Sequence, residues 1–293
     1  MTHKAGFVNI IGNPNVGKST LMNLLIGEKL CITNPKAQTT RHRILGIVND
    51  DDFQIVYSDT PGILKPNYKM QEGMMKFVNT ALVDADIILF MTDIFEKKNA
   101  HEEILEKLKN TKTPIVLLIN KIDLADQEKL ETVVDHWKNT FPKSIVIPLS
   151  ALEKFNIDSI QKQILTLLPE GEAYYPKDDL TDKSERFFIS EIIREKILTT
   201  YQKEIPYSCE VIVTSFKEEK KITRIEAEII VAKETQKGII IGHKGSKLKR
   251  VGSTARKDIE AFLSKQVFLE LFVKVNKDWR NNERQLKKYG YLH

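Results

Sequence analysis

The sequence predicts two domains: an α/β domain with a mostly parallel sheet and helices on both faces, followed by a smaller α+β domain. The chain has 293 residues, about twice the length of a typical domain. Short apolar runs alternate with amphipathic helical stretches through the first half, which is typical of a parallel sheet. After a polar, proline-containing stretch at residues 174–179, the order changes to α-β-β-α-α-β.

The first domain is assigned to residues 1–172. Its expected parallel strands are Phe7–Ile11, Gln54–Tyr57, Asp86–Met91, Ile115–Ile119 and Ile145–Pro148. Arg43–Val48 is expected to add an antiparallel strand at the edge. Helical periodicity marks segments such as Glu102–Lys109, Leu130–Trp137 and Ile157–Leu168.

Residues 173–183 are interpreted as a linker and residues 184–293 as the second domain. Its expected elements are a helix at Ser184–Tyr201, strands at Cys209–Phe216 and Thr223–Ala232, a helix at Leu248–Leu263, a strand at Val267–Val275 and a closing helix at Arg280–Lys288. Two of the strands alternate apolar and polar residues, as paired strands do. This order differs from another βαβ unit and indicates a separate α+β domain.

Composition and charge exclude several classes of protein. Hydrophobic residues make up 41% and charged residues 29%, as in ordinary globular proteins, so wholesale disorder is excluded. No apolar run could span a bilayer, and no signal peptide is recognised. Cys31 and Cys209 stand far apart, which fits a reducing cytoplasm. Residues 1–172 carry 20 Lys/Arg and 22 Asp/Glu, whereas residues 173–293 carry 25 and 18, so the second domain is expected to meet a polyanion.

The strongest motif is a phosphate loop that follows the first strand and precedes a helix at Thr20–Leu25. Its pattern G-x-x-x-x-G-K-[ST] is formed by Gly12, Asn13, Pro14, Asn15, Val16, Gly17, Lys18 and Ser19, with Thr20 next in the chain. The backbone N–H groups and the helix N-terminus favour phosphate. Lys18 can reach the β- and γ-phosphates, and the Ser19 hydroxyl can bind Mg²⁺.

Three further segments, each after a strand, indicate that the nucleotide is GTP. They are Asp59-Thr60-Pro61-Gly62, Asn120-Lys121-Ile122-Asp123 and Ser150-Ala151. We expect Asp59 to hold Mg²⁺ through water and the Gly62 N–H to meet the γ-phosphate. The Asp123 carboxylate can accept hydrogen bonds from guanine N1–H and the exocyclic amine, a donor pair that adenine lacks. Asn120 and Lys121 would brace the base, and the backbone of Ser150–Ala151 would meet guanine O6.

Four residues in or near the phosphate loop bear on hydrolysis. Thr39 and Thr40 both stand where a loop threonine can bind Mg²⁺ and sense the γ-phosphate, and we prefer Thr40. Ile63 follows Gly62, where Ras-like GTPases use a glutamine to position water, so unassisted hydrolysis is expected at about 10⁻⁴–10⁻³ s⁻¹. Asn15 is a candidate K⁺ ligand that would supply positive charge; the alternative is that it only shapes the loop.

The second informative stretch runs from Lys237 to Lys257 and holds seven Lys/Arg with no acidic residue. The candidate RNA-binding residues within it are Lys237, Gly238, Ile239, Ile240, Ile241, Gly242, His243, Lys244, Gly245, Lys247, Lys249 and Arg250. Two short helices are expected to meet at the turn Gly242–Gly245. Such a GxxG turn lets a nucleic-acid backbone approach closely and clamps about four nucleotides, and lysines add salt-dependent attraction. The apolar residues Ile239–Ile241 would form a floor under the bases.

Alternatives to RNA binding stay open at this point. The basic stretch could be a solvated face of a helix–turn–helix, or could touch anionic lipid peripherally. His243 could stack on a base or be an ordinary surface residue, and Trp279 could extend the binding surface or lie in the core.

Together these residues resemble the Era family of bacterial GTPases over nearly the whole chain. The resemblance rests on Gly12–Ser19, Ala37-Gln38-Thr39-Thr40-Arg41, Asp59–Gly62, Asn120–Asp123, Ser150–Ala151, Tyr174-Tyr175-Pro176, Lys237–Lys249 and Lys277-Asp278-Trp279-Arg280. It implies a type II KH domain that binds the 3′ end of 16S rRNA, GTP-favoured RNA binding, RNA-stimulated hydrolysis and a role in late maturation of the 30S subunit. It also implies peripheral association with the inner membrane. Asn13 departs from the arginine that relatives often carry.

Three functional hypotheses follow. The leading one is a cytoplasmic, monomeric GTPase that acts as a GTP-gated RNA-binding switch with Mg²⁺ and a candidate K⁺ ion. The second is a membrane-surface signalling GTPase whose basic domain reads lipid headgroups, which the lack of lipidation signals disfavours. The third is a GTPase that uses the second domain only as a protein-interaction scaffold, which leaves the acid-free stretch unexplained.

Overall fold

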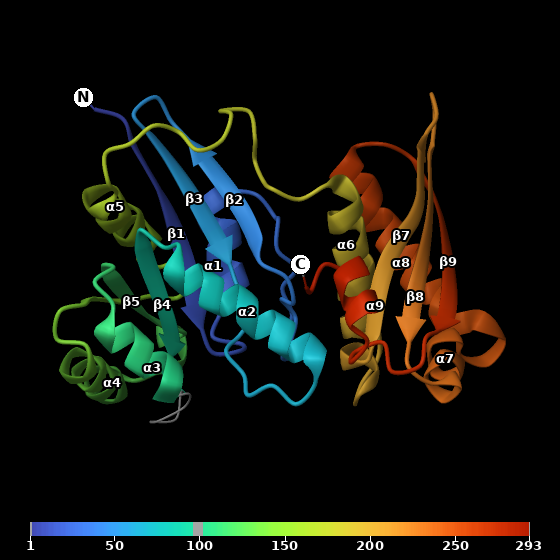
Figure 1. Cartoon of the computed structure of the whole chain (residues 1–293), viewed down its shortest axis with the longest axis horizontal. Helices are drawn as coiled ribbons and strands as arrows, with labels where there is room; N and C mark the ends of the chain where they lie inside the picture. Colours follow the sequence, from blue (N-terminus) through green and yellow to red (C-terminus); the bar gives the residue numbers. More distant parts are fainter. Residues whose placement is uncertain (1, 96–101, 293) are drawn as a thin grey trace. The chain divides into compact units, whose positions relative to one another are not determined.

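The computed structural model describes residues 2–95 and 102–292, which form two compact units (Figure 1). The first unit comprises Met1–Cys31, Thr40–Pro66 and Met74–Asp182. The second comprises Ile32–Thr39, Asn67–Gly73 and Lys183–His293. The expected division of the chain was therefore too simple, because two short segments from the first half pack with the second unit. The periodicity of the sequence indicates helices and strands in chain order, so it cannot show that a segment of the first half packs with the second unit.

The first unit is built on a six-stranded sheet with the order β2-β3-β1-β4-β5-β6. The strands are β1 (Lys4–Gly12), β2 (Ile44–Asn49), β3 (Phe53–Asp59), β4 (Ile87–Asp93), β5 (Ile115–Asn120) and β6 (Ile145–Pro148). All neighbouring pairs are parallel except β2 and β3. The expected mostly parallel sheet with an antiparallel edge strand is confirmed.

Helices cover both faces of this sheet (Figure 1). They are α1 (Lys18–Ile26), α2 (Lys69–Val83), α3 (Glu102–Asn110), α4 (Gln127–Thr140) and α5 (Ile157–Leu167), with a 3₁₀ turn at Ile122–Leu124. The helix α2 was not among the expected elements. Its buried residues Val78 and Ala81 join side chains of α3, α4 and the central strands in one apolar cluster. On β2, a Cβ at Gly46 would lie 2.1 Å from the Ile26 side chain, so α1 packs closely against this strand.

The stretch interpreted as a linker is ordered against the first sheet. The backbone N–H groups of Tyr174 and Tyr175 donate to Gln54 Oε1, and Gln54 Nε2 donates to Tyr175 O. Further along, the Ile47 N–H donates to Leu180 O at 2.8 Å. This segment satisfies backbone groups of the edge strand β2, which blunts an edge that could otherwise pair with another chain.

The second unit contains a three-stranded sheet with the order β7-β8-β9, in which β7 and β8 are antiparallel and β8 and β9 are parallel. Its elements are α6 (Glu185–Thr200), β7 (Cys209–Glu218), β8 (Thr223–Val231), α7 (Glu234–Ile241), α8 (Ser246–Leu263), β9 (Val267–Val275) and α9 (Glu283–Lys288). The α-β-β-α-α-β order is confirmed. Its core joins Ile189, Ile193 and Ile197 of α6 to Ile259 of α8 and to the sheet. The four-residue spacing on α6 places these isoleucines on one face.

Candidate nucleotide site and nucleic-acid interface

The phosphate loop joins β1 to α1 and depends on glycine at two positions. Gly17 has a φ of 106°, and a Cβ there would lie 2.3 Å from Asn120 Nδ2. A Cβ at Gly12 would lie 2.0 Å from the carbonyl oxygen of Met91. Lys18 is buried, and its ammonium donates to Gly12 O at 3.0 Å and to Asn13 O at 2.8 Å. The loop thus places a cation inside a backbone curl of the kind that receives phosphates.

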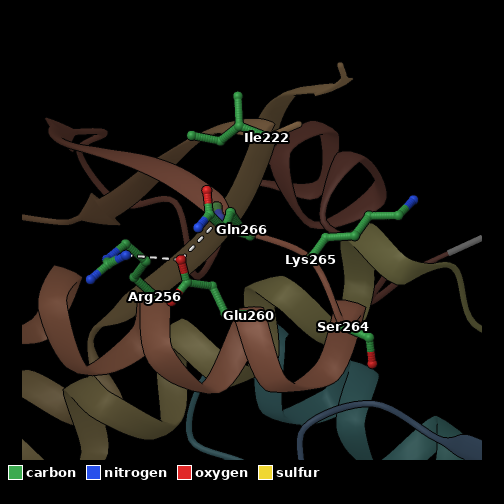
Figure 2. Close-up of a pocket in the computed structure, with 7 residues that line it drawn as sticks. Ile222, Arg256, Glu260, Ser264, Lys265 and Gln266 are labelled. Carbon is green, nitrogen blue, oxygen red and sulfur yellow. Dashed lines mark hydrogen bonds and ion pairs between the residues drawn. The ribbon is translucent and has the colours of Figure 1, made fainter. Parts of the chain in front are cut away.

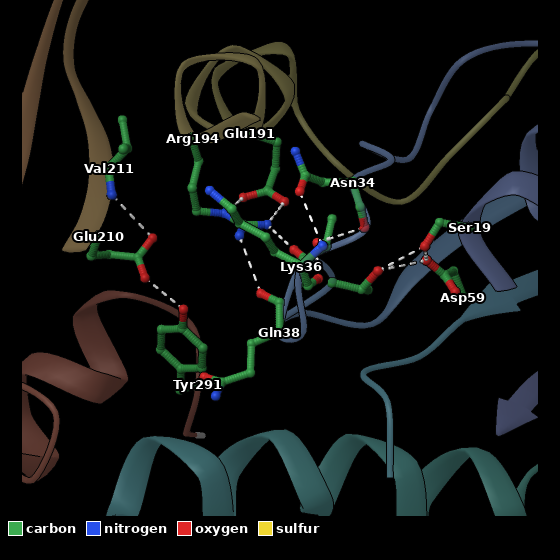
Figure 3. Close-up of polar contacts among 12 residues, drawn as sticks. Ser19, Asn34, Lys36, Gln38, Asp59, Glu191, Arg194, Glu210, Val211 and Tyr291 are labelled. Carbon is green, nitrogen blue, oxygen red and sulfur yellow. Dashed lines mark hydrogen bonds and ion pairs between the residues drawn. The ribbon is translucent and has the colours of Figure 1, made fainter. Parts of the chain in front are cut away.

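Beside this loop, one carboxylate and two hydroxyls from three separate segments lie within hydrogen-bond reach (Figure 3). The Ser19 hydroxyl donates to Asp59 Oδ2 at 2.6 Å, and the Thr40 hydroxyl donates to the same oxygen at 3.1 Å. Ser19 Oγ and Thr40 Oγ1 are 2.8 Å apart. Thr39 instead donates to the carbonyl of Lys36 at 2.6 Å. Of the two threonines, only Thr40 shares the cluster, in agreement with the preference stated above.

This oxygen cluster fits a divalent cation. Asp59 is fully buried, and its Oδ1 has no hydrogen-bond partner among the described residues. Burial raises the pKa of the Asp59 carboxyl, while the Lys18 charge and the hydroxyls of Ser19 and Thr40 act in the opposite direction. A cation would favour the charged carboxylate. Oxygen ligands with a single carboxylate match the small, hard Mg²⁺ ion, which keeps several waters.

The expected base-binding residues also lie together. Asn120 Nδ2 donates to Val16 O at 2.7 Å, so this residue ties the end of β5 to the phosphate loop. The Lys121 ammonium lies 2.6 Å from Asp93 Oδ2. The Ser150 hydroxyl donates to Asp123 Oδ1 at 2.6 Å, which fixes the carboxylate. This arrangement prepares Asp123 to accept hydrogen bonds from a purine edge.

The backbone N–H groups of Ser150 and Ala151, which were expected to face guanine O6, make hydrogen bonds within the protein in this structure. The Ala151 N–H donates to Asn120 Oδ1 at 2.9 Å, and the Ser150 N–H donates to Phe155 O at 3.3 Å. Both amides are therefore used inside the protein in this structure. Ser150 pairs with Phe155 in an isolated bridge that closes this loop, and the contact with guanine O6 stays a prediction.

The segment after β3 lies against the phosphate loop. A Cβ at Gly62 would lie 2.7 Å from Pro14 Cα, so only glycine fits there without a shift of backbone. The Thr60 hydroxyl donates to Ile10 O at 2.8 Å and is buried. Ile63 lies in the apolar core and its N–H donates to Gly12 O at 3.1 Å. Its side chain therefore has no access to an attacking water.

In the second unit, α7 and α8 meet at the GxxG turn as expected, although α8 is a long helix of 18 residues. Gly242 and Gly245 have φ values of 72° and 76°, which favour glycine. The side chains of His243, Lys244, Lys247, Lys249 and Arg250 are exposed. These residues present a basic surface on both sides of the turn.

The apolar floor predicted at Ile239–Ile241 needs correction. Ile240 is fully buried and belongs to the core of the second unit, and Ile241 packs partly against that core. Ile239 is 43% exposed. A helix turns successive residues to different sides, so only Ile239 of the three isoleucines has an exposed side chain.

Two other features of the second unit do not add to this interface. Trp279 is fully buried, and its indole N–H donates to Ser208 O at 3.4 Å, so the core reading of this residue is correct. A shallow hollow of about 580 Å³ lies between α8 and β9 (Figure 2). Its Arg256 pairs with Glu260 at 2.8 Å, so the lining carries mixed charge and no cationic cluster.

Sequence reasoning missed the residues that hold segments 32–39 and 67–73 to the second unit. Arg194 of α6 hydrogen-bonds with the Gln38 and Thr39 carbonyls, and Lys36 with carbonyls at the end of α6. In segment 67–73, the Met70 N–H donates to Arg280 O at 2.9 Å. One signal was available: Glu191 and Arg194 stand three residues apart on α6, the spacing of an ion pair on one helix face.

No helix in the described part of the chain is long and apolar enough to cross a membrane. Residues 2–95 and 102–292 likewise contain no group of three or more His, Cys, Asp or Glu side chains arranged to hold a metal ion. The candidate cation site is instead the cluster of one carboxylate and two hydroxyls.

Comparisons with known proteins match both units. A family model described as a 50S ribosome-binding GTPase matches residues 7–121, and a KH-domain model matches residues 204–280. The chain is 49% identical to GTPase Era of Alkaliphilus metalliredigens, over 99% of this chain and 100% of that protein. It is 47% identical to GTPase Era of Staphylococcus haemolyticus, over 99% of this chain and 98% of that one.

Two solved structures share the whole architecture, each with a TM-score of 0.95 and 40% identity over 99% of this chain and 100% of the other. One is Era in complex with MgGDPNP and nucleotides 1506–1542 of 16S ribosomal RNA. The other is an Aquifex aeolicus Era variant bound to GDP·AlF₄⁻. With the phosphate loop, the base-binding residues and the GxxG turn in place, this chain belongs to the Era family of GTPases.

Proposed function

We propose that this GTPase is a nucleotide-gated RNA-binding switch that binds single-stranded RNA from the 3′ end of 16S rRNA during assembly of the 30S subunit. One observation carries the proposal: a GTPase site and an exposed, basic GxxG turn occur in one chain. The relative with a TM-score of 0.95 that was solved with a 16S rRNA fragment supports the choice of RNA. In this reading, the GTP state favours RNA binding and hydrolysis releases the RNA.

The nucleotide site supplies the positioning that phosphoryl transfer needs. Lys18 would bind the β- and γ-phosphates, and Asp123 would select guanine. Ser19 and Thr40 would hold Mg²⁺ directly, and Asp59 through water. When bound, this ion supplies positive charge that neutralises charge developing on the phosphate oxygens. The structure supports these roles through the shared hydrogen bonds of Ser19, Thr40 and Asp59.

Hydrolysis is proposed to be slow without help, because the buried Ile63 cannot orient water. Asn15 is a candidate ligand for K⁺. Its side chain is exposed and makes no hydrogen bond to any described residue, and its φ of 65° shapes the loop. Asn15 can therefore both bind K⁺ and shape the phosphate loop.

The RNA interface is proposed to consist of the GxxG turn and the lysines around it. Lys237, Lys244, Lys247, Lys249 and Arg250 would attract the phosphates, and the glycines would let the RNA backbone approach. Ile239 would contact a base. Membrane-surface binding is kept as an outcome of the test.

The proposal is tested by measuring RNA affinity with GDP and with a non-hydrolysable GTP analogue. The RNA is a short strand that matches the 16S rRNA 3′ end, and a scrambled strand is the control. Tighter, sequence-dependent binding with the analogue is expected. Equal binding in both nucleotide states and to both strands would refute the switch, and flotation with anionic vesicles would then test the lipid alternative.

The interface is tested by Lys244→Ala combined with Lys247→Ala. Removing two phosphate contacts is expected to weaken RNA binding and to lower the slope of log affinity against log salt by about 1.4, since each contact on a single strand adds about 0.7. Lys220→Ala with Lys221→Ala is the matched control, because both lysines are exposed in the turn between β7 and β8. Equal slopes for the two double variants would contradict the assignment.

A further inference from the structure

The segment 32–39, which leads directly to Thr40, is bound to the C-terminal end of α6 within the second unit. The Lys36 ammonium donates to the carbonyl oxygens of Leu198 and Tyr201, the latter at 2.5 Å. These carbonyls have no partner within the helix, since they lie in its last turn and at its C-cap. The negative end of the helix dipole favours a cation there. Lys36 therefore acts as a charged cap that ties the segment to α6.

A second tie lies one turn earlier on α6 and acts on the residue next to Thr40 (Figure 3). Arg194 and Glu191 are both buried, and Arg194 Nε donates to Glu191 Oε1 at 2.7 Å. The same guanidinium donates to the carbonyls of Gln38 and Thr39. The carboxylate thus fixes the orientation of a rigid donor group. The backbone on the N-terminal side of Thr40 is held by a side chain of the RNA-binding unit.

Tyr201, at the C-cap of α6, reaches from these ties to the RNA-binding turn. Its carbonyl accepts from Lys36, and its hydroxyl donates to Ile240 O at 2.6 Å. Ile240 stands two residues before Gly242, at the end of α7. The Lys247 ammonium lies 5.9 Å from the centre of the Tyr201 ring. Burial raises the pKa of the Tyr201 phenol to about 12, so the hydroxyl stays protonated and remains a donor at neutral pH.

We propose that Lys36, Arg194 and Tyr201 are positioning residues that couple the nucleotide state of Thr40 to the conformation of the GxxG turn. This inference rests on the proposed function and names its route of regulation. Thr40 bonds with Ser19 and Asp59, whereas Thr39, its neighbour in the chain, is held by Arg194. A shift of the loop at Thr40 must therefore strain or release the ties on α6. The same helix end holds Ile240 O through Tyr201, which places the turn under the same constraint.

The route is tested by the coupling factor, the ratio of RNA affinities with the GTP analogue and with GDP. Tyr201→Phe removes only the hydroxyl that binds Ile240 O. It is expected to lower the coupling factor about two- to tenfold, the range of one hydrogen bond, while the affinity with GDP changes less than about twofold. Tyr207→Phe is the matched control. Tyr207 lies in the same unit, its side chain is partly exposed, and its hydroxyl bonds to no described residue.

Lys36→Met is an independent variant that removes the contact between segment 32–39 and the Tyr201 carbonyl. It removes two charge-assisted hydrogen bonds, so a fall in the coupling factor of about tenfold or more is expected. Lys112→Met is its control, because Lys112 is exposed in the turn before β5. If the two residues act in series, combining Tyr201→Phe with Lys36→Met lowers the factor by less than the product of the single effects.

Reciprocity separates coupling from a structural role. RNA must raise the affinity for the GTP analogue, relative to GDP, by the same factor, and each variant must lose that factor equally in both measurements. A structural defect would instead weaken RNA binding in both nucleotide states and leave the ratio unchanged. A wild-type ratio of one would refute the switch itself. A wild-type ratio well above one that is preserved in Tyr201→Phe and Lys36→Met would overturn only this inference.

Discussion

Asp123→Asn tests the guanine site through a change of one atom in the side chain. Asp123 Oδ1 accepts from the Ser150 hydroxyl at 2.6 Å, so the carboxylate is held in place before a base arrives. Guanine would donate two hydrogen bonds to it, from N1–H and from the exocyclic amine. Each hydrogen bond to a charged group contributes about 1.5–3 kcal/mol. The asparagine oxygen can still accept from N1–H, whereas its N–H₂ group cannot accept from the exocyclic amine. Losing that one bond costs about 1.5–3 kcal/mol, so we expect GDP affinity to fall at least roughly 10- to 10²-fold.

A more specific result is a change of preference from guanine to xanthine. Xanthine carries a carbonyl where guanine carries the exocyclic amine, and the asparagine N–H₂ group can donate to that oxygen. Displacement of a fluorescent guanine nucleotide by GDP and by xanthosine diphosphate measures both affinities. Asp135→Asn is the control, because Asp135 is exposed on α4 and no hydrogen bond or ion pair joins its side chain to another described residue. If Asp123→Asn still prefers GDP to xanthosine diphosphate, Asp123 does not read the base.

The remaining predictions concern the cation sites. Thr40→Ala is expected to weaken Mg²⁺-dependent binding of the GTP analogue but to leave GDP affinity within about threefold. Thr39→Ala should leave both affinities nearly unchanged. Titrating Mg²⁺ at fixed nucleotide measures these effects, and equal effects of the two variants would contradict the assignment of Thr40. Replacing Na⁺ by K⁺ should accelerate single-turnover hydrolysis if Asn15 binds K⁺, and Asn15→Gly, which keeps the positive φ accessible, should abolish that acceleration. An equal response to K⁺ in the variant would leave Asn15 as a residue that only shapes the loop.

Motifs that combine chain order with special backbone needs could be predicted from the sequence. Gly12 and Gly17 were identified from the phosphate-loop pattern. The structure gives the reason for glycine there, because any side chain would collide with Met91 or Asn120. The mostly parallel sheet around them was predictable from the alternation of apolar runs and helices. The edge strand at Ile44–Asn49 was also predictable, because its expected position and its antiparallel pairing both appear in the structure.

Tertiary contacts decided what the sequence left open or hid. Thr39 and Thr40 are adjacent and chemically identical, and only the position of Asp59 distinguishes them. The run of isoleucines near the GxxG turn has no internal signal that Ile240 faces the core. The hydrogen bond of the Ala151 amide to Asn120, a residue 31 positions away, was not anticipated. Such long-range pairings carry no local periodicity.

The energies of the ties on α6 are large enough for the proposed coupling. A 100-fold difference in RNA affinity between two nucleotide states requires about 2.7 kcal/mol of coupling free energy. Lys36 donates charge-assisted hydrogen bonds to carbonyls at the end of α6, and Arg194 donates them to carbonyls of segment 32–39. Each such bond contributes about 1.5–3 kcal/mol. Weakening one tie in one nucleotide state would therefore suffice. A ligand shifts an equilibrium only by its differential affinity for the two states. In the proposed route, the γ-phosphate exerts this effect through Thr40, the residue that follows the tied carbonyl of Thr39.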